Sequence, residues 1–145
     1  MVSVELEHVQ RVWDGMRPNS PIYRFLLSNV QIISAGHGTV KAHLKVEEDH
    51  LNSKGTLHGA VSACLTDWAG GLAIASHGLE KTGISTDIHT SYLSTAKLGD
   101  WLEVEGRANK VGNTLAFTTV TITKLVDGSP GPVVTTGTHT KYVKY

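Results

Sequence analysis

The fold is decided by one stretch of the sequence, Leu57-His58-Gly59-Ala60-Val61-Ser62-Ala63-Cys64-Leu65-Thr66-Asp67-Trp68-Ala69-Gly70-Gly71-Leu72-Ala73-Ile74-Ala75-Ser76-His77-Gly78. The stretch contains no proline and one formal charge, Asp67, and its apolar residues recur every three or four positions. This spacing predicts a buried helix from about His58 to Ser76. We expect the rest of the chain to fold around this helix.

The predicted helix has two faces, because residues three and four apart lie on the same side. The bulky face suits packing against a sheet and consists of Val61, Leu65, Trp68, Leu72 and Ala75. The narrow face consists of Ala60, Cys64, Asp67, Gly71 and Ile74. A carboxylate in such surroundings is costly unless it is paired, hydrogen-bonded or protonated, which makes Asp67 a candidate functional residue. The alternative is an aspartate that caps a loop or reaches water from an imperfectly buried helix.

The start of the helix is a second candidate site. A polar loop, Asn52-Ser53-Lys54-Gly55-Thr56-Leu57, leads into His58 and Gly59. Gly59 has no side chain to keep a ligand away from the unpaired amides of the first turn. These amides and the helix dipole form a site for a developing oxyanion. A histidine that only caps the helix is the alternative for His58.

One helix cannot bring His58 and Asp67 together. The two residues are nine positions apart, which places them on opposite sides of the helix and about 13 Å apart along its axis. If both serve one reaction, the site combines His58 of one subunit with Asp67 of another. A twofold axis between two antiparallel helices would form that site twice.

The sequence resembles the hotdog-fold acyl-coenzyme A thioesterases, and within them the acyl-coenzyme A thioesterase 13 (thioesterase superfamily member 2) and PaaI-like branch. The resemblance runs from about Val30 to Tyr142. It rests on His58-Gly59-Ala60 with an acid nine residues after the histidine, Asn52-x-x-Gly55-Thr56-Leu57, Ser85-Thr86-Asp87-Ile88, Tyr92-Leu93-Ser94-Thr95-Ala96-Lys97-Leu98-Gly99, Asn113-Thr114-Leu115-Ala116-Phe117-Thr118 and Thr138-His139-Thr140-Lys141.

The resemblance implies hydrolysis of a thioester. Gly59 would offer its amide to the thioester oxygen, while His58 and Asn52 place the thioester. Asp67 of the partner subunit would act as general base on water or attack directly to give an anhydride, and Ser85 would help to position the water. The acyl group would be a medium or long fatty chain, as in the branch, or an aryl-acyl group, as in bacterial relatives.

The resemblance also implies a binding site for coenzyme A. No cofactor is expected, because coenzyme A belongs to the substrate. Lys97 and Lys110 would contact the phosphates, and solvated strand-end lysines are the alternative. Thr95, Asn113 and Ala60 depart from the branch, which has proline, lysine and often glycine there. The matching residues are Tyr92, Leu93, Ser94, Thr95, Ala96, Lys97, Lys110, Val111, Gly112, Asn113, Thr114, Leu115 and Tyr142.

Composition limits the function classes. Thirteen basic and thirteen acidic residues give no net charge, which disfavours nucleic acid or an anionic membrane surface as a partner. No apolar run is long enough to span a membrane. The single cysteine, Cys64, excludes an intramolecular disulfide and fits a reducing compartment. Acidic residues near the amino terminus argue against a targeting peptide. We expect a cytoplasmic protein, with a mitochondrial location as the alternative.

The 145 residues predict one domain of α+β class, residues 1–145, with a helical segment at 1–28. The resemblance implies a hotdog fold, an antiparallel six-stranded sheet wrapped around the long helix, in a homo-oligomer with a dimer as its minimal unit and a tetramer by analogy. In Gly83 to Ser94 we expect Ser85, Asp87, His89 and Ser91 on one face and Ile84, Thr86, Ile88, Thr90 and Tyr92 on the other. The expected helices are Val4 to Met16 and Tyr23 to Leu27, and the other strands are Val30 to His37, Gly38 to Val46, Trp101 to Val111, Leu115 to Leu125 and Val133 to Lys144.

Other readings of the sequence are weaker. The eight histidines show no metal-ligand spacing, so we expect no metal. Cys64 lies about 120° around the helix from His58, which favours a buried structural cysteine over a nucleophile. No nucleophile elbow and no phosphate-binding or dinucleotide fingerprint is present. A non-catalytic acyl-coenzyme A or lipid-binding hotdog protein remains the main alternative. A hotdog dehydratase is a third, although Asp49-His50 lacks the spacing of its acid and histidine.

Overall fold

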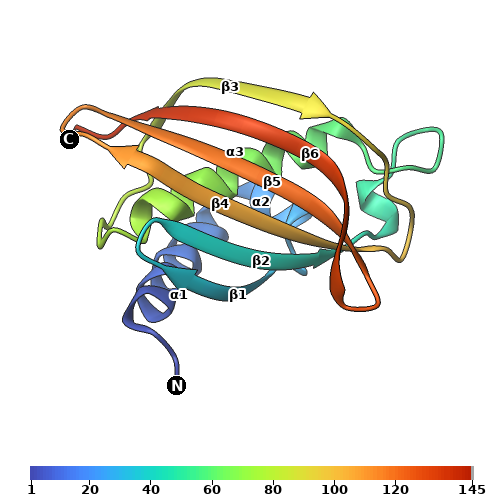
Figure 1. Cartoon of the computed structure of the whole chain (residues 1–145), viewed down its shortest axis with the longest axis horizontal. Helices are drawn as coiled ribbons and strands as arrows, with labels where there is room; N and C mark the ends of the chain where they lie inside the picture. The colour runs from blue at the N-terminus through green and yellow to red at the C-terminus, as the bar shows by residue number, and fades with distance from the viewer. Residues whose placement is uncertain (145) are drawn as a thin grey trace.

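The computed structural model describes residues 1–144, which form one six-stranded sheet, three α-helices and two short 3₁₀ helices (Figure 1). The helices are α1 Val4–Met16, α2 Pro21–Leu26 and α3 Gly59–Ala75, with 3₁₀ turns at Arg17–Asn19 and Glu48–His50. The strands are β1 Gln31–Gly36, β2 Thr39–Lys45, β3 Ile84–Tyr92, β4 Trp101–Val111, β5 Leu115–Val126 and β6 Ser129–Tyr142.

The central helix α3 forms where the sequence predicts it. His58 is its N-cap residue, and the Nδ1 atom of this histidine accepts a hydrogen bond of 2.9 Å from the amide of Ala60. Ser76 is the C-cap residue. The bulky face of the helix, from Val61 to Ala75, is buried at every predicted position. Burial of this face supplies the main apolar contact between α3 and the sheet.

The sheet curves around α3 with its strands in the order β1-β2-β4-β5-β6-β3 (Figure 1). All neighbouring strands are antiparallel. The predicted architecture, an antiparallel six-stranded sheet around a long helix, is therefore confirmed. β1 and β3 are the two edges of the sheet.

Glycines on the strands let α3 approach the sheet closely. A methyl group on Gly106 of β4 would lie 2.5 Å from the backbone oxygen of Ala69, and one on Gly137 of β6 would lie 2.7 Å from Cγ2 of Thr66. Carbon atoms of real side chains do not come this close to other atoms. Any residue larger than glycine at position 106 or 137 would therefore push α3 away from the sheet. The polar residues of α3 are thereby held against β6.

A β-bulge corrects the predicted faces of β3. Ser85 pairs with Lys141, whereas Asp87 pairs with Thr140, so one additional residue lies on β3 between them. The prediction that Ser85 and Ile88 lie on opposite faces of the strand is therefore wrong, because the strict alternation of faces ends at the bulge. Ser85 lies on the same face as Ile88, and this face turns toward α3.

The start of β6 also differs from the prediction. Asp127 and Gly128 both have positive φ angles, 52° and 79°, and form a two-residue turn after which Ser129 pairs with Val126. The strand therefore begins at Ser129 and not at Val133. Pro130 and Pro132 lack an amide donor, but the pairing of β5 with β6 is irregular here and tolerates them. The other strand boundaries agree with the prediction to within about two residues.

The helices of the N-terminal segment cover α3. The indole of Trp13 on α1 lies edge-on to the indole of Trp68 on α3, with 5.4 Å between the ring centroids. It also lies edge-on to the phenol of Tyr23 on α2, with 5.8 Å between the centroids. α1 ends at Met16, two residues before Pro18. None of the helices in the described part of the chain has the length and apolar character that crossing a bilayer needs.

Candidate active site

Asp67 lies at the centre of a polar cluster between α3 and the sheet. One carboxylate oxygen, Oδ2, accepts a hydrogen bond of 3.3 Å from the hydroxyl of Tyr23. The other, Oδ1, lies 3.7 Å from Nε2 of His139 and 3.8 Å from Nζ of Lys141. The Asp67 side chain is 37% exposed, so one side of the carboxylate remains open. Asp67 therefore faces the sheet and does not cap a loop.

His139 connects Asp67 with Ser85. The ring is fully buried, and its Nε2 shares a hydrogen bond of 2.7 Å with the Ser85 hydroxyl. Burial, and next the Lys141 ammonium, lower the pKa of His139 below its usual 6.5, against the opposing effect of Asp67. The ring is therefore neutral at pH 7, and it can exchange a hydrogen bond with the serine without carrying charge.

Lys141 supplies the positive charge of the cluster. Its side chain is buried, which lowers the pKa of the ammonium, while Asp67 acts in the opposite direction. A methyl group on Gly71 would lie 3.2 Å from Nζ of Lys141, and one on Gly70 would lie 3.1 Å from Nδ1 of His139. The glycine pair of α3 thus makes room for both basic side chains of β6.

The start of α3 presents one amide without a partner. Nδ1 of His58 accepts from the Ala60 amide, and the His58 carbonyl oxygen accepts from the Val61 amide. Within residues 1–144, no acceptor is paired with the amide of Gly59. The hydroxyl of Tyr92 donates to the Gly59 carbonyl at 3.0 Å, and a methyl group on Gly59 would lie 3.1 Å from the Tyr92 ring. The Gly59 amide is therefore held in place and open to an acceptor.

Asn52 shapes the loop before α3. Its Oδ1 accepts from the amides of Lys54 and Thr56, and its Nδ2 donates to the Thr56 hydroxyl. These bonds fix the loop that delivers His58 to the helix start. The structure thus places Asn52 as a support for the helix start, with its side chain engaged by its own loop.

The Gly59 amide and the Asp67 cluster lie far apart within one chain. β3 connects them, because Tyr92 at its end contacts Gly59 and Ser85 near its start contacts His139. On α3 itself Gly59 precedes Asp67 by eight positions, which separates them by about 12 Å along the helix axis. A single thioester group cannot reach both. The Gly59 amide and the Asp67 cluster are therefore two candidate half-sites, one at each end of β3.

Comparisons with known proteins place the chain in a family. The family model described as thioesterase superfamily matches residues 54–131, which include α3, β3, β4 and β5. The chain belongs to the thioesterase superfamily.

Several relatives of this superfamily member cover about four fifths or more of its length. Human acyl-coenzyme A thioesterase 13 is 36% identical over 118 residues, 81% of this chain and 82% of the human protein. The crystal structure of zebrafish thioesterase superfamily member 2 matches with a TM-score of 0.81 and 33% identity, over 98% of this chain and 99% of the other. A hypothetical thioesterase protein from Streptococcus pneumoniae, solved with coenzyme A, matches with a TM-score of 0.71 and 31% identity, over 79% and 88%. The fold is the hotdog fold.

In this superfamily member the residues predicted to bind coenzyme A form two groups. Tyr92 to Lys97 lies beside the start of α3, where the backbone of Lys97 forms a bridge with Thr56. Lys110 to Leu115 lies at the opposite end of the sheet, where Tyr142 pairs with both Leu115 and Ile84. Figure 1 shows this separation, with the turn between β4 and β5 at one end and the segment that follows β3 at the other. One chain of the thioesterase does not bring the two groups together.

Three residues of the Asp67 cluster were not predicted from the sequence as site residues. The sequence could have indicated His139 and Lys141, because two basic residues two positions apart in a predicted strand lie on the same face. No sequence pattern indicated Tyr23, because it lies forty-four residues from Asp67 and only packing brings the two together. Each of the three approaches Asp67 from β6 or α2, elements distant from α3 in the sequence.

The remaining candidates give no second site in the thioesterase. Cys64 is half-buried and not fully buried as predicted, because the narrow face of α3 is open at its N-terminal half. Burial, and next the nearby Asp67, raise the pKa of its thiol to about 12. A neutral thiol is a poor nucleophile. Among residues 1–144, no group of three His, Cys, Asp or Glu side chains is arranged to hold a metal ion.

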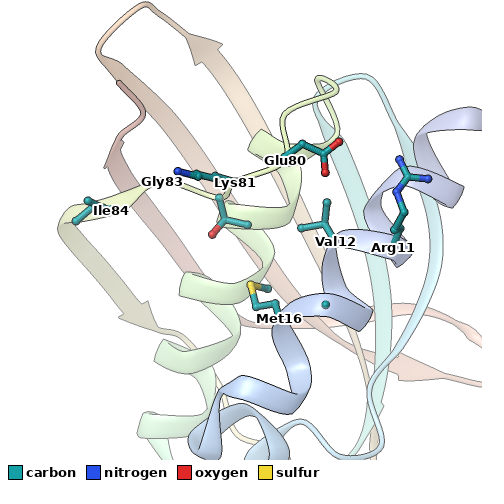
Figure 2. Close-up of a pocket in the computed structure, with 9 residues that line it drawn as sticks. Arg11, Val12, Met16, Glu80, Lys81, Gly83 and Ile84 are labelled. Carbon is teal, nitrogen blue, oxygen red and sulfur yellow. The ribbon is translucent and has the colours of Figure 1, made fainter. Parts of the chain in front are cut away.

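A cavity of about 590 Å³ lies between α1 and the segment that precedes β3. Val12 and Met16 reach into it from α1, opposite Lys81 and Gly83 (Figure 2). Thr82 of the cavity wall lies within 3.0 Å of the position that a methyl group on Gly71 would take, and the same position is 3.2 Å from Nζ of Lys141. The cavity of the thioesterase therefore adjoins the Asp67 cluster. Its lining consists of Arg11, Val12, Gly15, Met16, Glu80, Lys81, Thr82, Gly83 and Ile84.

Proposed function

We propose that the protein hydrolyses acyl-coenzyme A thioesters to the free acid and coenzyme A, at a site that two subunits share. Membership of the thioesterase superfamily supports hydrolysis of a thioester. The observation that carries the shared site is the position of the two half-sites at opposite ends of an edge strand, β3.

The β3 edge is suited to pairing with a second copy. It is nine residues long and exposes Ile84, Ile88 and Tyr92. A long apolar edge strand is a template for another strand. Two β3 strands that pair antiparallel about a twofold axis would place the Tyr92 end of one against the Ser85 end of the other. Gly59 of one subunit would then face Asp67 of its partner.

The same pairing would join the two groups of residues predicted to bind coenzyme A. Tyr92 to Lys97 of one subunit would approach Lys110 to Leu115 of the other, with one candidate phosphate partner, Lys97 or Lys110, in each group. A protein without net charge has to gather its positive charge locally for a nucleotide. The dimer is thus the minimal active unit, and a tetramer stays an expectation from the resemblance.

The chemistry follows from the groups around the thioester. The Gly59 amide donates to the carbonyl oxygen and stabilises the negative charge that develops there. Oδ1 of Asp67 takes a proton from water as the water oxygen attacks the carbonyl carbon. The carbon–sulfur bond then breaks, the proton passes to the sulfur, and the acid and the thiol of coenzyme A leave. Water is the only co-reactant.

The other members of the cluster assist this step. Oδ1 of Asp67 and Nε2 of His139 are 3.7 Å apart, so one water beside the pair could contact both atoms close to the Ser85 hydroxyl. Lys141 gives the carboxylate a positive partner 3.8 Å away. The lowered pKa makes the His139 ring a weaker base than an ordinary imidazole, and as a neutral ring it can orient the water through a hydrogen bond.

The cavity beside α1 supports a fatty acyl chain as the substrate group. Its inner wall adjoins Lys141 through Thr82 and Gly71, and its floor is formed by Val12 and Met16. A space of about 590 Å³ with an apolar floor suits an extended alkyl chain better than a single aromatic ring. We therefore place medium or long acyl chains before aryl-acyl groups.

Release of free thiol from a series of acyl-coenzyme A esters tests this function. We expect steady turnover by the wild-type protein, and a loss of about a thousandfold in kcat for Asp67→Asn with binding of coenzyme A retained. Absence of turnover on every ester, with coenzyme A still bound, would favour a non-catalytic binding protein. Mixed dimers of His58→Ala and Asp67→Asn contain one intact site, so coexpression should restore part of the activity. No recovery in mixed dimers shown to form would contradict the shared site.

A further inference from the structure

The N-terminal segment contributes one polar side chain to the cluster around Asp67. Tyr23 lies on α2, and its hydroxyl donates to Oδ2 of Asp67 at 3.3 Å. Burial, and next the negative charge of Asp67, raise the pKa of the phenol well above its usual 10. The hydroxyl therefore keeps its proton and remains a donor across the pH range in which the protein is folded.

The phenol ring is held in place independently of Asp67. It lies edge-on to Trp13, which in turn lies edge-on to Trp68 of α3. Both tryptophans are buried, so the position of the Tyr23 hydroxyl is set by the apolar core. A donor that the core fixes can orient a mobile acceptor.

The two oxygens of Asp67 face different surroundings. Oδ2 faces Tyr23, whereas Oδ1 faces His139 and Lys141 on the side where Ser85 lies. Rotation about the terminal bond of an aspartate is soft, so the two oxygens exchange easily unless one is held. A hydrogen bond to Oδ2 therefore keeps Oδ1 directed at His139 and Lys141, on the side where Ser85 lies.

We propose that Tyr23 is a positioning residue for the hydrolysis, which anchors Oδ2 of Asp67 so that Oδ1 faces the attacking water. This proposal rests on the proposed function, because the water matters only if Asp67 is the base. It gives the N-terminal segment a part in the site beyond covering α3. The titratable groups that face Asp67 are Tyr23 from α2, Cys64 from α3, and His139 and Lys141 from β6.

The variant Tyr23→Phe tests the proposal, because it keeps the ring and removes only the hydroxyl. We expect kcat to fall about tenfold, the loss of one hydrogen bond to a charged group, with KM unchanged. The acid limb of the kcat profile should move to higher pH, because a carboxylate that loses a donor is protonated more readily. A merely structural role would not move that limb.

Ser76→Ala is the matched control. The Ser76 hydroxyl is buried at the other end of α3, where it accepts from the Gly38 amide and donates to the Ala73 carbonyl oxygen. Its loss should lower the melting temperature and leave kcat and the pH profile unchanged. If Tyr23→Phe behaves like Ser76→Ala, or like the wild type, the positioning role is overturned.

The outcomes separate this proposal from the proposed function. An active wild type, an inactive Asp67→Asn and a fully active Tyr23→Phe would overturn the role of Tyr23 alone. A wild-type protein that hydrolyses no acyl-coenzyme A ester would overturn both. A tenfold lower kcat with a shifted acid limb in Tyr23→Phe, beside an unaffected Ser76→Ala, would support both.

Discussion

At the scale of single residues, the sequence identifies the acid of the proposed site but not its environment. Asp67 is conspicuous because it is the only formal charge in a helix of small and apolar residues. The groups that make it useful, Tyr23, His139 and Lys141, lie on other elements. Their proximity depends on Gly70 and Gly71, whose missing side chains leave space for the two basic groups.

Gly15 gives a residue-scale test of the proposed acyl-binding cavity, the one between α1 and the segment before β3. It lines the cavity, and no atom lies within 4 Å of the position that its Cβ would take, so a larger side chain fits without disturbing the fold. A phenylalanine there would fill part of the space for the chain. We expect Gly15→Phe to lower kcat/KM for dodecanoyl-coenzyme A about tenfold, with little change for butanoyl-coenzyme A.

Gly15→Ala is the control for this variant. The methyl group is small and alanine favours the helix, so the length profile should stay the same while stability rises by up to about 1 kcal/mol. Kinetics on esters of two to sixteen carbons would measure the profile. If Gly15→Phe leaves the dependence of kcat/KM on chain length unchanged, the acyl chain does not bind in this cavity.

At the scale of elements, periodicity predicts the helices and most strand boundaries but not the irregular points. The two caps of α3, His58 and Ser76, coincide with the predicted ends because capping is a local property. The bulge after Ser85 is not local, since it depends on how β3 pairs with β6. That bulge turns Ser85 toward His139. The strand whose faces the sequence predicted wrongly, β3, therefore supplies the hydroxyl that bonds His139 in the Asp67 cluster.

The open edge of β3 leads to an element-scale prediction. Ile88 lies at the middle of β3 and is 41% exposed. Ile88→Lys would place two positive charges close together if two β3 strands pair about a twofold axis, and it should yield folded monomers without thioesterase activity. Sedimentation and circular dichroism would measure assembly and folding.

A matched substitution lies on the other edge of the sheet. Ile33 of β1 is 46% exposed, and Ile33→Lys should leave assembly and activity unchanged. If Ile88→Lys assembles like the wild type, β3 is not the edge that joins the subunits. If both variants dissociate, an exposed charge and not the β3 edge explains the loss.

At the scale of the whole molecule, stability should depend on pH through two histidines. The pKa of His139 is lowered mainly by burial and next by Lys141, and that of His77 mainly by burial and next by His37, whose ring centroid is 4.0 Å away. In the unfolded chain these histidines bind protons below pH 6.5, the ordinary pKa of histidine. In the folded protein their pKa values are lower, so they bind fewer protons at the same pH. The folded state is therefore favoured above pH 6.5 and loses stability as the pH falls.

Urea denaturation at a series of pH values measures this effect. We expect the free energy of unfolding to decrease as the pH is lowered from about 7 to about 5, and His77→Gln to reduce the slope. A free energy of unfolding that is flat or rises over this interval would show that neither histidine is kept neutral by folding.

The sequence by itself determined the six strands and the central helix, with Asp67 at the middle of the helix and the Gly59 amide at its start. Periodicity, capping and spacing along the chain are short-range properties, so the sequence contains them. The tertiary structure alone decided which side chains surround that acid, which face of β3 carries Ser85, and that the Gly59 amide and the Asp67 cluster lie at opposite ends of one edge strand. Those features arise from contacts between elements far apart in the chain, and no local pattern of residues encodes them.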